Sequence, residues 1–247
     1  MSEERWGERD AEWYDELAAD MFRPEVVGPV VDLLTELAGD GAALELGVGT
    51  GRIALPLAAR GVQVYGIDVS AAMVARLRAK PGSEDIGVTV GDFSATRVSG
   101  TFSLVYMVWN AITNLTTQDE QVACVQNAAA HLEPGGCLVA EVDVPALQRL
   151  PPGETVRPFA VGATRLGFDE YDVVAQGVVL HHFWKAGETF EASSAPYRYV
   201  WPAELDLMAR IAGMRLRERW GGWSREPFTR LSTQHVSVWE LRPPGAL

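Results

Sequence analysis

Residues 42–51 read AALELGVGTG, and this stretch decides the fold, because a short apolar run passes directly into a turn that contains Gly47, Gly49 and Gly51. Glycine admits positive φ angles and carries no Cβ that would keep a ligand from the backbone. The helix expected after the turn begins with unpaired N–H groups that favour a polar ligand. The segment therefore predicts a strand, turn and helix that hold a nucleotide-like group, although a glycine turn of this kind can also be purely structural.

Strand-like and helix-like segments alternate around this turn. We expect strands at 42–46, 62–67, 86–90, 102–108 and 137–144, and helices at 52–60, 71–79 and 119–132. Thr117 and Glu120 have the spacing of a capping box for the last of these helices. Residues 25–38 also have helical spacing, but Gly28 and Pro29 predict a kink or a late start. Such alternation builds a parallel sheet with helices on both faces.

From residue 151 the pattern changes. Pro151, Pro152 and Gly153 precede β-prone runs at 155–166, 173–184 and 195–201, which predict an antiparallel insert. A helix at 202–214 and strands at 215–220 and 234–241 then return to the core. The predicted fold is α/β, with an open, mostly parallel seven-stranded sheet, helices on both faces and a small antiparallel insert after strand five.

Composition limits the classes of function. The chain has 247 residues, of which 47% are hydrophobic, and its 33 acidic against 21 basic residues give a charge of -12 that disfavours nucleic acid as a partner. No signal peptide or membrane span is recognised, so we expect a cytoplasmic protein without a membrane partner. Cys124 and Cys137 indicate neither a disulfide framework nor a metal cluster, and we expect both to be buried.

Two further strand ends carry an acid. The second strand ends in G-I-D-V-S and the third in G-D-F, so Asp68 and Asp92 reach the same edge of the sheet as the glycine turn. A carboxylate at Asp68 can accept hydrogen bonds from vicinal ribose hydroxyls, and Asp92 can accept from an exocyclic amino group with Phe93 beside the ring. Ser70 is expected to cap the next helix. Taken alone, either acid could equally lie in a solvated loop. Together, the glycine turn and the two acidic strand ends predict a crevice that binds a ligand.

These segments, in this order and spacing, resemble the cofactor motifs of class I S-adenosylmethionine-dependent methyltransferases, most closely the amino-sugar N-methyltransferase and natural-product branches. The resemblance extends to Trp13, Tyr14 and Asp15, to L-E-P-G-G at 132–136 and to I-A-G-M at 211–214. It implies S-adenosylmethionine as the cofactor, S-adenosylhomocysteine as the product and no metal. It also implies that residues 1–150 and 202–247 form a cofactor-binding core with an N-terminal helical segment, and 151–201 a lid or substrate insert. The cofactor-binding residues that it implies are Tyr14, Glu45, Gly47, Gly49, Gly51, Asp68, Val69, Met73, Asp92, Phe93 and Met107.

Two alternatives are retained. The G-x-G-x-G spacing and the acid at Glu45 argue against an NAD-dependent oxidoreductase, whose turn reads G-x-G-x-x-G around a pyrophosphate. The other alternative is a non-catalytic S-adenosylmethionine-binding module. Val48 departs from the resemblance, because many relatives have Cys or Gly there.

Methyl transfer needs alignment and a dry pocket more than a special nucleophile. We expect transfer to N, O or S of a small-molecule acceptor, a secondary metabolite, by a protein that can also form a homodimer. The aromatic-rich insert suits a lid, with a small core of its own as the alternative. If a base is needed, the candidates are Asp143, His181 and Tyr14. Glu141 is expected on the same strand face as Asp143, and His182 is expected to face the opposite way from His181. Asp143 can alternatively bind a cationic amine, and His131 and His235 are expected to be structural.

Overall fold

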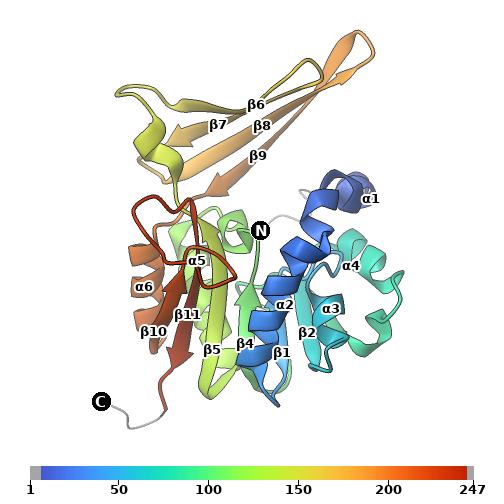
Figure 1. Ribbon diagram of the computed structural model, residues 1–247, viewed down its shortest axis with the longest axis vertical. Coiled ribbons are helices and arrows are strands. Elements are labelled where there is room, and N and C mark those ends of the chain that lie inside the picture. The colour runs from blue at the N-terminus through green and yellow to red at the C-terminus, as the bar shows by residue number, and fades with distance from the viewer. Residues whose placement is uncertain (1–6, 244–247) are drawn as a thin grey trace.

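The computed structural model describes residues 7–243 and forms a seven-stranded sheet with a smaller four-stranded sheet above one edge (Figure 1). The strand order of the large sheet is β10-β11-β5-β4-β1-β2-β3. Strands β1 to β5 run parallel, and β11 is antiparallel to both β5 and β10. The strands are β1 (Ala43–Leu46), β2 (Val64–Asp68), β3 (Gly87–Val90), β4 (Phe102–Met107), β5 (Leu132–Asp143), β10 (Met214–Trp220) and β11 (Gln234–Leu241). The predicted α/β fold is confirmed.

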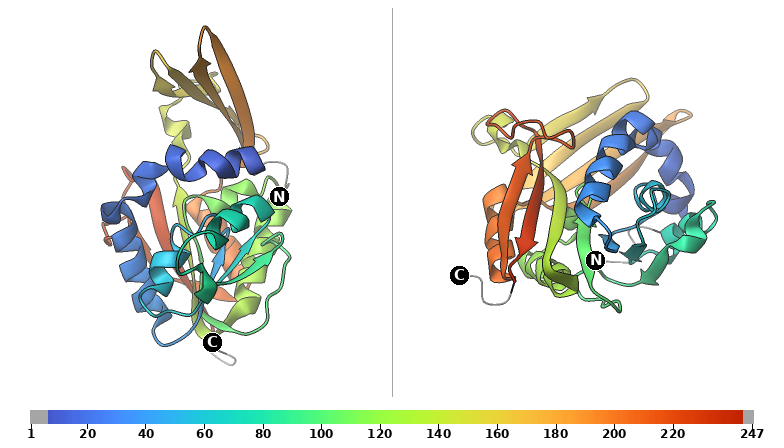
Figure 2. Two further views of the ribbon diagram at one scale, coloured as in Figure 1. Left: turned by 90° about the vertical axis from the view of Figure 1, so that its right-hand side faces the viewer. Right: turned by 60° about the horizontal axis from the view of Figure 1, so that its bottom comes forward.

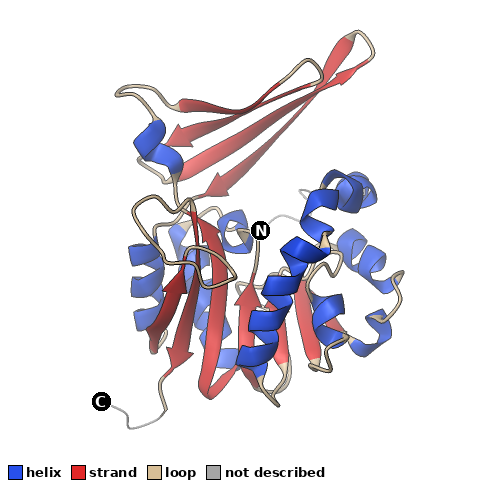
Figure 3. Ribbon diagram, in the orientation of Figure 1, coloured by secondary structure: helices blue, strands red, loops and turns tan. Residues whose placement is uncertain are grey.

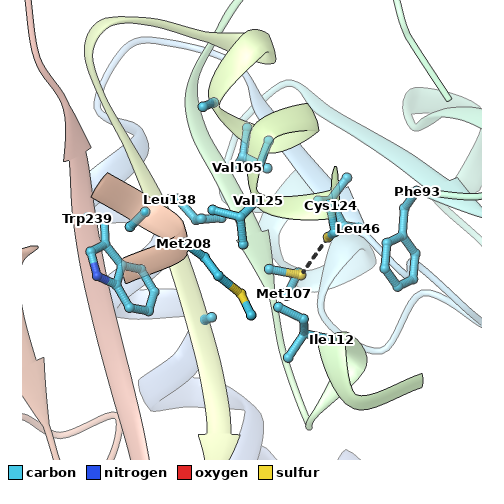
Figure 4. Close-up of a cluster of buried hydrophobic side chains, with 14 of the residues drawn as sticks. Leu46, Phe93, Val105, Met107, Ile112, Cys124, Val125, Leu138, Met208 and Trp239 are labelled. Atoms are coloured by element: carbon cyan, nitrogen blue, oxygen red, sulfur yellow. Dashed lines mark hydrogen bonds between the residues drawn. The ribbon is translucent and has the colours of Figure 1, made fainter. Parts of the chain in front are cut away.

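Helices cover both faces of this sheet. On one face, α5 (Gln118–His131) and α6 (Pro202–Ile211) pack over β4 and β5, and Figure 4 shows Val105 and Met107 of β4 in this core. On the other face, α2 (Pro24–Ala38) and α3 (Ala54–Ala58) enclose a second core that includes Leu104 and Tyr106. Successive residues of β4 therefore enter opposite cores, because side chains alternate along a strand.

Most of the other helices lie near the carboxyl edge of the sheet, and the exception is the short helix directly before β3, which lies at the opposite edge. The other helices are α1 (Glu8–Leu17), η2 (Ala19–Phe22), α4 (Ala71–Arg78), η3 (Ser83–Asp85), η4 (Ala111–Asn114) and η5 (Ala146–Arg149). The expected cap of α4 is confirmed, since the Ser70 hydroxyl accepts from the Met73 N–H at 3.1 Å. The capping box of Thr117 and Glu120 at the start of α5 is also present.

Two helix predictions were inaccurate. The expected late start at 25–38 is wrong, because α2 begins with Pro24 in its first turn and continues through Pro29. Pro24 suits that place because the first N–H groups of a helix have no intrahelical partner. The helix expected at 52–60 is reduced to the five residues of α3, preceded by a turn.

The segment after β5 forms the second sheet, shown in Figure 3 as strands joined by loops. It consists of β6 (Val156–Val161), β7 (Arg165–Asp172), β8 (Gly177–Ala186) and β9 (Thr189–Arg198), paired in that order and all antiparallel. We call it the upper sheet. The β-prone runs in the sequence predicted antiparallel strands here, but the predicted strand limits differ from the observed ones. One reason is that the turn at 173–176 contains Val173 and Val174, which are β-prone.

The base of the upper sheet is fixed to the helices beneath it. The Arg198 guanidinium is buried, pairs with Glu204 of α6 at 2.8 Å and donates to the Gln121 side chain of α5. Gln121 in turn donates to the Arg198 carbonyl at 3.1 Å, and Gln176 donates to Glu204 at 2.8 Å. These buried contacts position the upper sheet over the carboxyl edge of the large one.

Candidate active site

One large cavity lies at the carboxyl edge of the large sheet, under the upper sheet and beside α1. Its volume is about 930 Å³, near the upper end of the range of roughly 300–1,000 Å³ typical of ligand pockets. Its walls come from the glycine turn, α1, the turn after β4, the end of β5, the upper sheet and the loop at 221–233. A cavity of this size and place can hold two ligands side by side, one against the glycine turn and one beneath the upper sheet.

The glycine turn and Asp68 form one hydrogen-bonded unit. The two Asp68 carboxylate oxygens accept from the Gly49 N–H at 2.7 Å and from the Ser70 N–H at 2.8 Å. Burial raises the pKa of Asp68, and these backbone hydrogen bonds oppose that rise. Gly47 and Gly49 line the cavity with φ angles of 86° and 52°, so the backbone itself faces a ligand there. Asp68 keeps further lone pairs for hydroxyl donors, as ribose recognition requires.

Glu45 lies beneath the glycine turn and is only 2% exposed. Burial raises its pKa to about 8, while hydrogen bonds from the Tyr106 hydroxyl, at 2.9 Å, and from the Ala54 N–H lower it. Arg52 lowers it further through its charge. Because Glu45 lines the cavity, a cationic ligand group near it would favour the ionised carboxylate.

The N-terminal helix α1 is tied to the glycine turn and lends Tyr14 to the cavity wall. Asp15 accepts from the Thr50 hydroxyl at 2.5 Å and forms an ion pair with Lys80, whose ammonium also donates to the Thr50 carbonyl at 2.8 Å. The Tyr14 ring lies 6.0 Å from that of Trp109. Burial raises the pKa of Tyr14, so this phenol stays protonated and is better suited to donate a hydrogen bond than to act as a base.

The turn after β4 has an unusual backbone. Trp109 and Asn110 have φ angles of 49° and 61°, in the left-handed region that non-glycine residues rarely adopt. The Trp109 N–H donates to the Glu141 carboxylate at 2.8 Å, and Asn110 exchanges hydrogen bonds with Asp143, donating to its carboxylate at 3.0 Å and accepting from its N–H at 2.7 Å. The other Glu141 oxygen accepts from the Trp223 indole at 2.8 Å. Glu141 therefore holds two loops together and has no oxygen left without a partner.

Two carboxylates face the part of the cavity beneath the upper sheet. Asp143 ends β5 and Asp169 belongs to β7, and both line the cavity. The surrounding protein desolvates Asp143 and raises its pKa, against the hydrogen bond from Asn110. Burial also raises the pKa of Asp169, which the charge of Asp143 raises further and Arg157 lowers. Tyr171 donates to Asp169 at 3.4 Å.

The structure brings most of the predicted cofactor residues together. Tyr14, Glu45, Gly47, Gly49, Asp68, Met73 and Phe93 all line the cavity. Gly51, Val69 and Asp92 lie next to lining residues but are not part of the wall. The Asp92 carboxylate accepts from the N–H of Ser94 at 2.8 Å and from its hydroxyl at 2.7 Å.

Two predicted site residues point away from the cavity. Met107 is 1% exposed in the core beneath α5, with its sulfur 3.7 Å from that of Cys124 (Figure 4), because its place on β4 alternates it onto that face. His181 lies on the outer face of the upper sheet, where it bonds Ser194 at 2.7 Å and Glu170 at 3.1 Å. Its neighbour His182 lines the cavity instead. His131 and His235 are buried and hydrogen-bonded, as expected.

Sequence reasoning missed the residues beneath the upper sheet. Asp169 and Arg157 belong to strands without a motif, and Arg230 to a loop, so only strand register and loop path place them. Tyr171 was expected only as one of the aromatic residues of the insert. The family resemblance also implies that residues 106–110, after strand four, line the cofactor and the acceptor pocket, and Asn110 belongs to this segment. Its hydrogen bonds with Asp143 could not be foreseen, because they depend on the pairing of β4 with β5.

Taken together, a doubly wound sheet with a glycine turn and a ribose-type acid at its carboxyl edge defines a nucleoside-cofactor-binding α/β protein. A family model described as a methyltransferase domain matches residues 43–136. The CcbJ methyltransferase from Streptomyces caelestis is 35% identical with a TM-score of 0.87, and the match covers 98% of this chain and 100% of that one. The cypemycin N-terminal methyltransferase of a Streptomyces species is 28% identical over 241 residues, 94% of this chain and 98% of the relative.

S-adenosylmethionine-bound CalS10, an amino pentose methyltransferase from Micromonospora echinaspora, shares the fold at a TM-score of 0.68 and 23% identity, covering 88% of this chain and 90% of that one. The chain belongs to the class I S-adenosylmethionine-dependent methyltransferase family. S-adenosylmethionine is its cofactor, and the nicotinamide alternative finds no support in these relatives. Cys124 and Cys137 are both free and buried. Within residues 7–243 no helix is long and apolar enough to span a bilayer, and no three His, Cys, Asp or Glu side chains gather as a metal site.

Proposed function

We propose that this enzyme methylates the nitrogen of an amine on a small natural product. The observation that carries the proposal is the pair Asp143 and Asp169, which both line the cavity, one from the end of β5 and the other from β7, close enough for the charge of Asp143 to raise the pKa of Asp169. Two carboxylates attract a cationic ammonium, the form in which an aliphatic amine arrives at neutral pH. A neutral alcohol or thiol acceptor carries no positive charge for this pair to hold.

The amine must lose a proton before its lone pair can attack. A carboxylate with a raised pKa is the better proton acceptor, and the pKa of Asp143 is raised by desolvation. Asn110 holds the Asp143 carboxylate at 3.0 Å, which fixes the direction in which Asp143 can accept. We assign Asp143 as the base and Asp169 as the group that holds the ammonium.

The cofactor half of the cavity would be formed by Glu45, Gly47, Gly49, Asp68 and the ring of Phe93. S-adenosylmethionine, when bound, supplies an electrophilic methyl group on a positively charged sulfur. Glu45 and Asp68 provide the negative charge and the acceptors that suit its cationic end and its ribose. The upper sheet, with residues 151–201, would exclude water from the acceptor and supply the specificity, and Tyr14 of α1 would close the other side.

The proposed acceptor is a small molecule and not a nucleic acid, because a charge of -12 repels phosphate backbones. Relatives support the choice of nitrogen, since one is named for an N-terminal substrate and another for an amino pentose.

The test measures S-adenosylhomocysteine formation by mass spectrometry with matched acceptors that differ only in an amine, hydroxyl or thiol. We expect turnover of the amine alone. Asp143→Asn and Asp169→Asn should each lower kcat/KM by about tenfold to a hundredfold, while the dissociation constant of S-adenosylmethionine stays within about threefold.

Glu188→Gln, an exposed substitution at the tip of the β8–β9 hairpin, is the matched control and should leave both constants unchanged. Faster turnover of the hydroxyl or thiol compound would overturn the assignment to nitrogen. Equal loss of cofactor affinity in the two aspartate variants would show that these residues do not belong to an acceptor site.

A further inference from the structure

Three arginines line one end of the cavity and take no part in the function described so far. Arg149 belongs to η5, Arg157 to β6 and Arg230 to the loop at 221–233. In Figure 1, η5 (yellow-green) and that loop (dark red) lie beside the start of β6, on the side of the cavity away from α1. The right-hand view of Figure 2 shows the same neighbourhood, again opposite α1.

The chain connections confirm that these segments meet. The Val144 N–H, just before η5, donates to the Thr233 carbonyl at the end of the loop at 2.8 Å. Asp143 pairs with Gln234 across β5 and β11, and Arg157 pairs with Asp169 across β6 and β7. The arginine end therefore adjoins the proposed amine site, and the two meet where Arg157 lies beside Asp169.

The charges at this end are not balanced by the protein. Arg149 and Arg230 form no salt bridge or side-chain hydrogen bond with any residue from 7 to 243, whereas Arg198, Arg219 and Arg225 are each paired with a carboxylate. Arg157 faces Asp169, whose pKa it lowers. Both side chains are exposed, so water solvates them, and in a chain with a net charge of -12 they place positive charge on this part of the cavity wall.

We propose that Arg149, Arg157 and Arg230 form an anion subsite and that the acceptor carries an oxyanion group, such as a carboxylate or a phosphate, in addition to the amine. Guanidinium groups bind such oxyanions through two parallel N–H donors, which fixes orientation as well as charge. The subsite would turn the amine toward Asp143 and the cofactor. This inference rests on the proposed amine methylation for its role in catalysis, but the binding of an anion is independent of it.

The first experiment measures binding alone. The full-length protein saturated with S-adenosylhomocysteine is titrated by calorimetry with 3-phenylpropionate, phenyl phosphate and 3-phenylpropylamine. We expect one of the two anions to bind, and Arg149→Gln or Arg230→Gln to weaken that binding by about tenfold. The better of the two anions identifies whether a carboxylate or a phosphate is preferred.

Arg210→Gln on α6 is the control, because it removes the same charge at an exposed position outside the cavity. Affinity for S-adenosylhomocysteine should be unchanged in all variants. Neither anion binding, or equal weakening by Arg210→Gln, would overturn the subsite.

The second experiment measures methylation of an amine that bears a free acid and of its neutral methyl ester. The acid should be preferred by about tenfold or more, and Arg149→Gln and Arg230→Gln should remove that preference without slowing the ester. Equal loss for acid and ester would overturn the anion subsite while amine methylation still stands. Absence of methylation with either compound would contradict the proposed function, and the anion titration would still decide on the subsite.

Discussion

Replacing Asp68 with Asn separates its binding role from its structural one. Asp68 accepts the Gly49 N–H at 2.7 Å and the Ser70 N–H at 2.8 Å, one with each carboxylate oxygen. Asparagine keeps a single acceptor oxygen, so one of these N–H groups would face an amide NH2 that cannot accept. The same substitution removes the charge that we propose to receive the ribose hydroxyls.

The two effects differ in size. Losing a charge-assisted hydrogen bond to the ligand weakens binding by about 1.5–3 kcal/mol, or roughly tenfold to more than a hundredfold in the dissociation constant. The free energy of unfolding without cofactor should fall by less, about 1 kcal/mol, because a neutral amide avoids the desolvation that raises the pKa of Asp68. Binding should therefore suffer more than folding.

Calorimetric titration with S-adenosylhomocysteine gives the first quantity, and urea unfolding followed by tryptophan fluorescence gives the second. Asp85→Asn, an exposed position in η3 outside the cavity, is the control for a lost surface charge away from the site. A folded Asp68→Asn protein with unchanged affinity would refute a ribose role. A loss of stability as large as the loss of affinity would show that Asp68 mainly shapes the turn.

Three further outcomes test other parts of the site. Burial raises the pKa of Glu45 in the folded protein to about 8, above the ordinary glutamate value of 4.5, so the cofactor-free protein should lose stability as pH rises from about 5 to 8. Glu45→Gln should flatten this pH dependence in a series of urea unfolding curves. Asn110→Gly should lower kcat/KM about tenfold without loss of unfolding free energy, whereas Asn110→Ala should lower both quantities. Equal unfolding free energies of the Gly and Ala variants would refute backbone strain at this turn. Asp15→Asn should raise KM for S-adenosylmethionine about threefold to tenfold with kcat unchanged, and a changed kcat would contradict a role limited to holding α1.

The cofactor half of the site could be predicted because its determinants are local. Each strand end carries its own signal, and parallel pairing brings the ends together without further information. In the structure Glu45 pairs with Gly66 and Asp68 with Val90, which sets the three strand ends side by side. Met107 is the exception, since the alternation of β4 decides which core it enters and the sequence does not specify the face.

The acceptor half could not be predicted, because it depends on strand register. His181 and His182 had to face opposite ways, but the sequence could not say which would face the cavity. In the upper sheet His182 pairs with Gly167 and His181 with Phe168, so His182 shares its face with Asp169 and Tyr171. A shift of one residue in that register would exchange the two faces, and no local pattern excludes it.

The turn at Trp109 and Asn110 shows why such a site needs more than its motif residues. Two successive non-glycine residues in the left-handed region destabilise the fold by roughly 1–2 kcal/mol each. Glycine would relieve this strain, but it would remove the side chain that both donates to the Asp143 carboxylate and accepts the Asp143 N–H. The hydrogen bond that Trp109 donates to Glu141 and the two that Asn110 exchanges with Asp143 offset the strain and fix the Asp143 carboxylate. The strained conformation is therefore best explained as the structural requirement for holding Asp143, the proposed base, in the cavity wall where it can reach the acceptor.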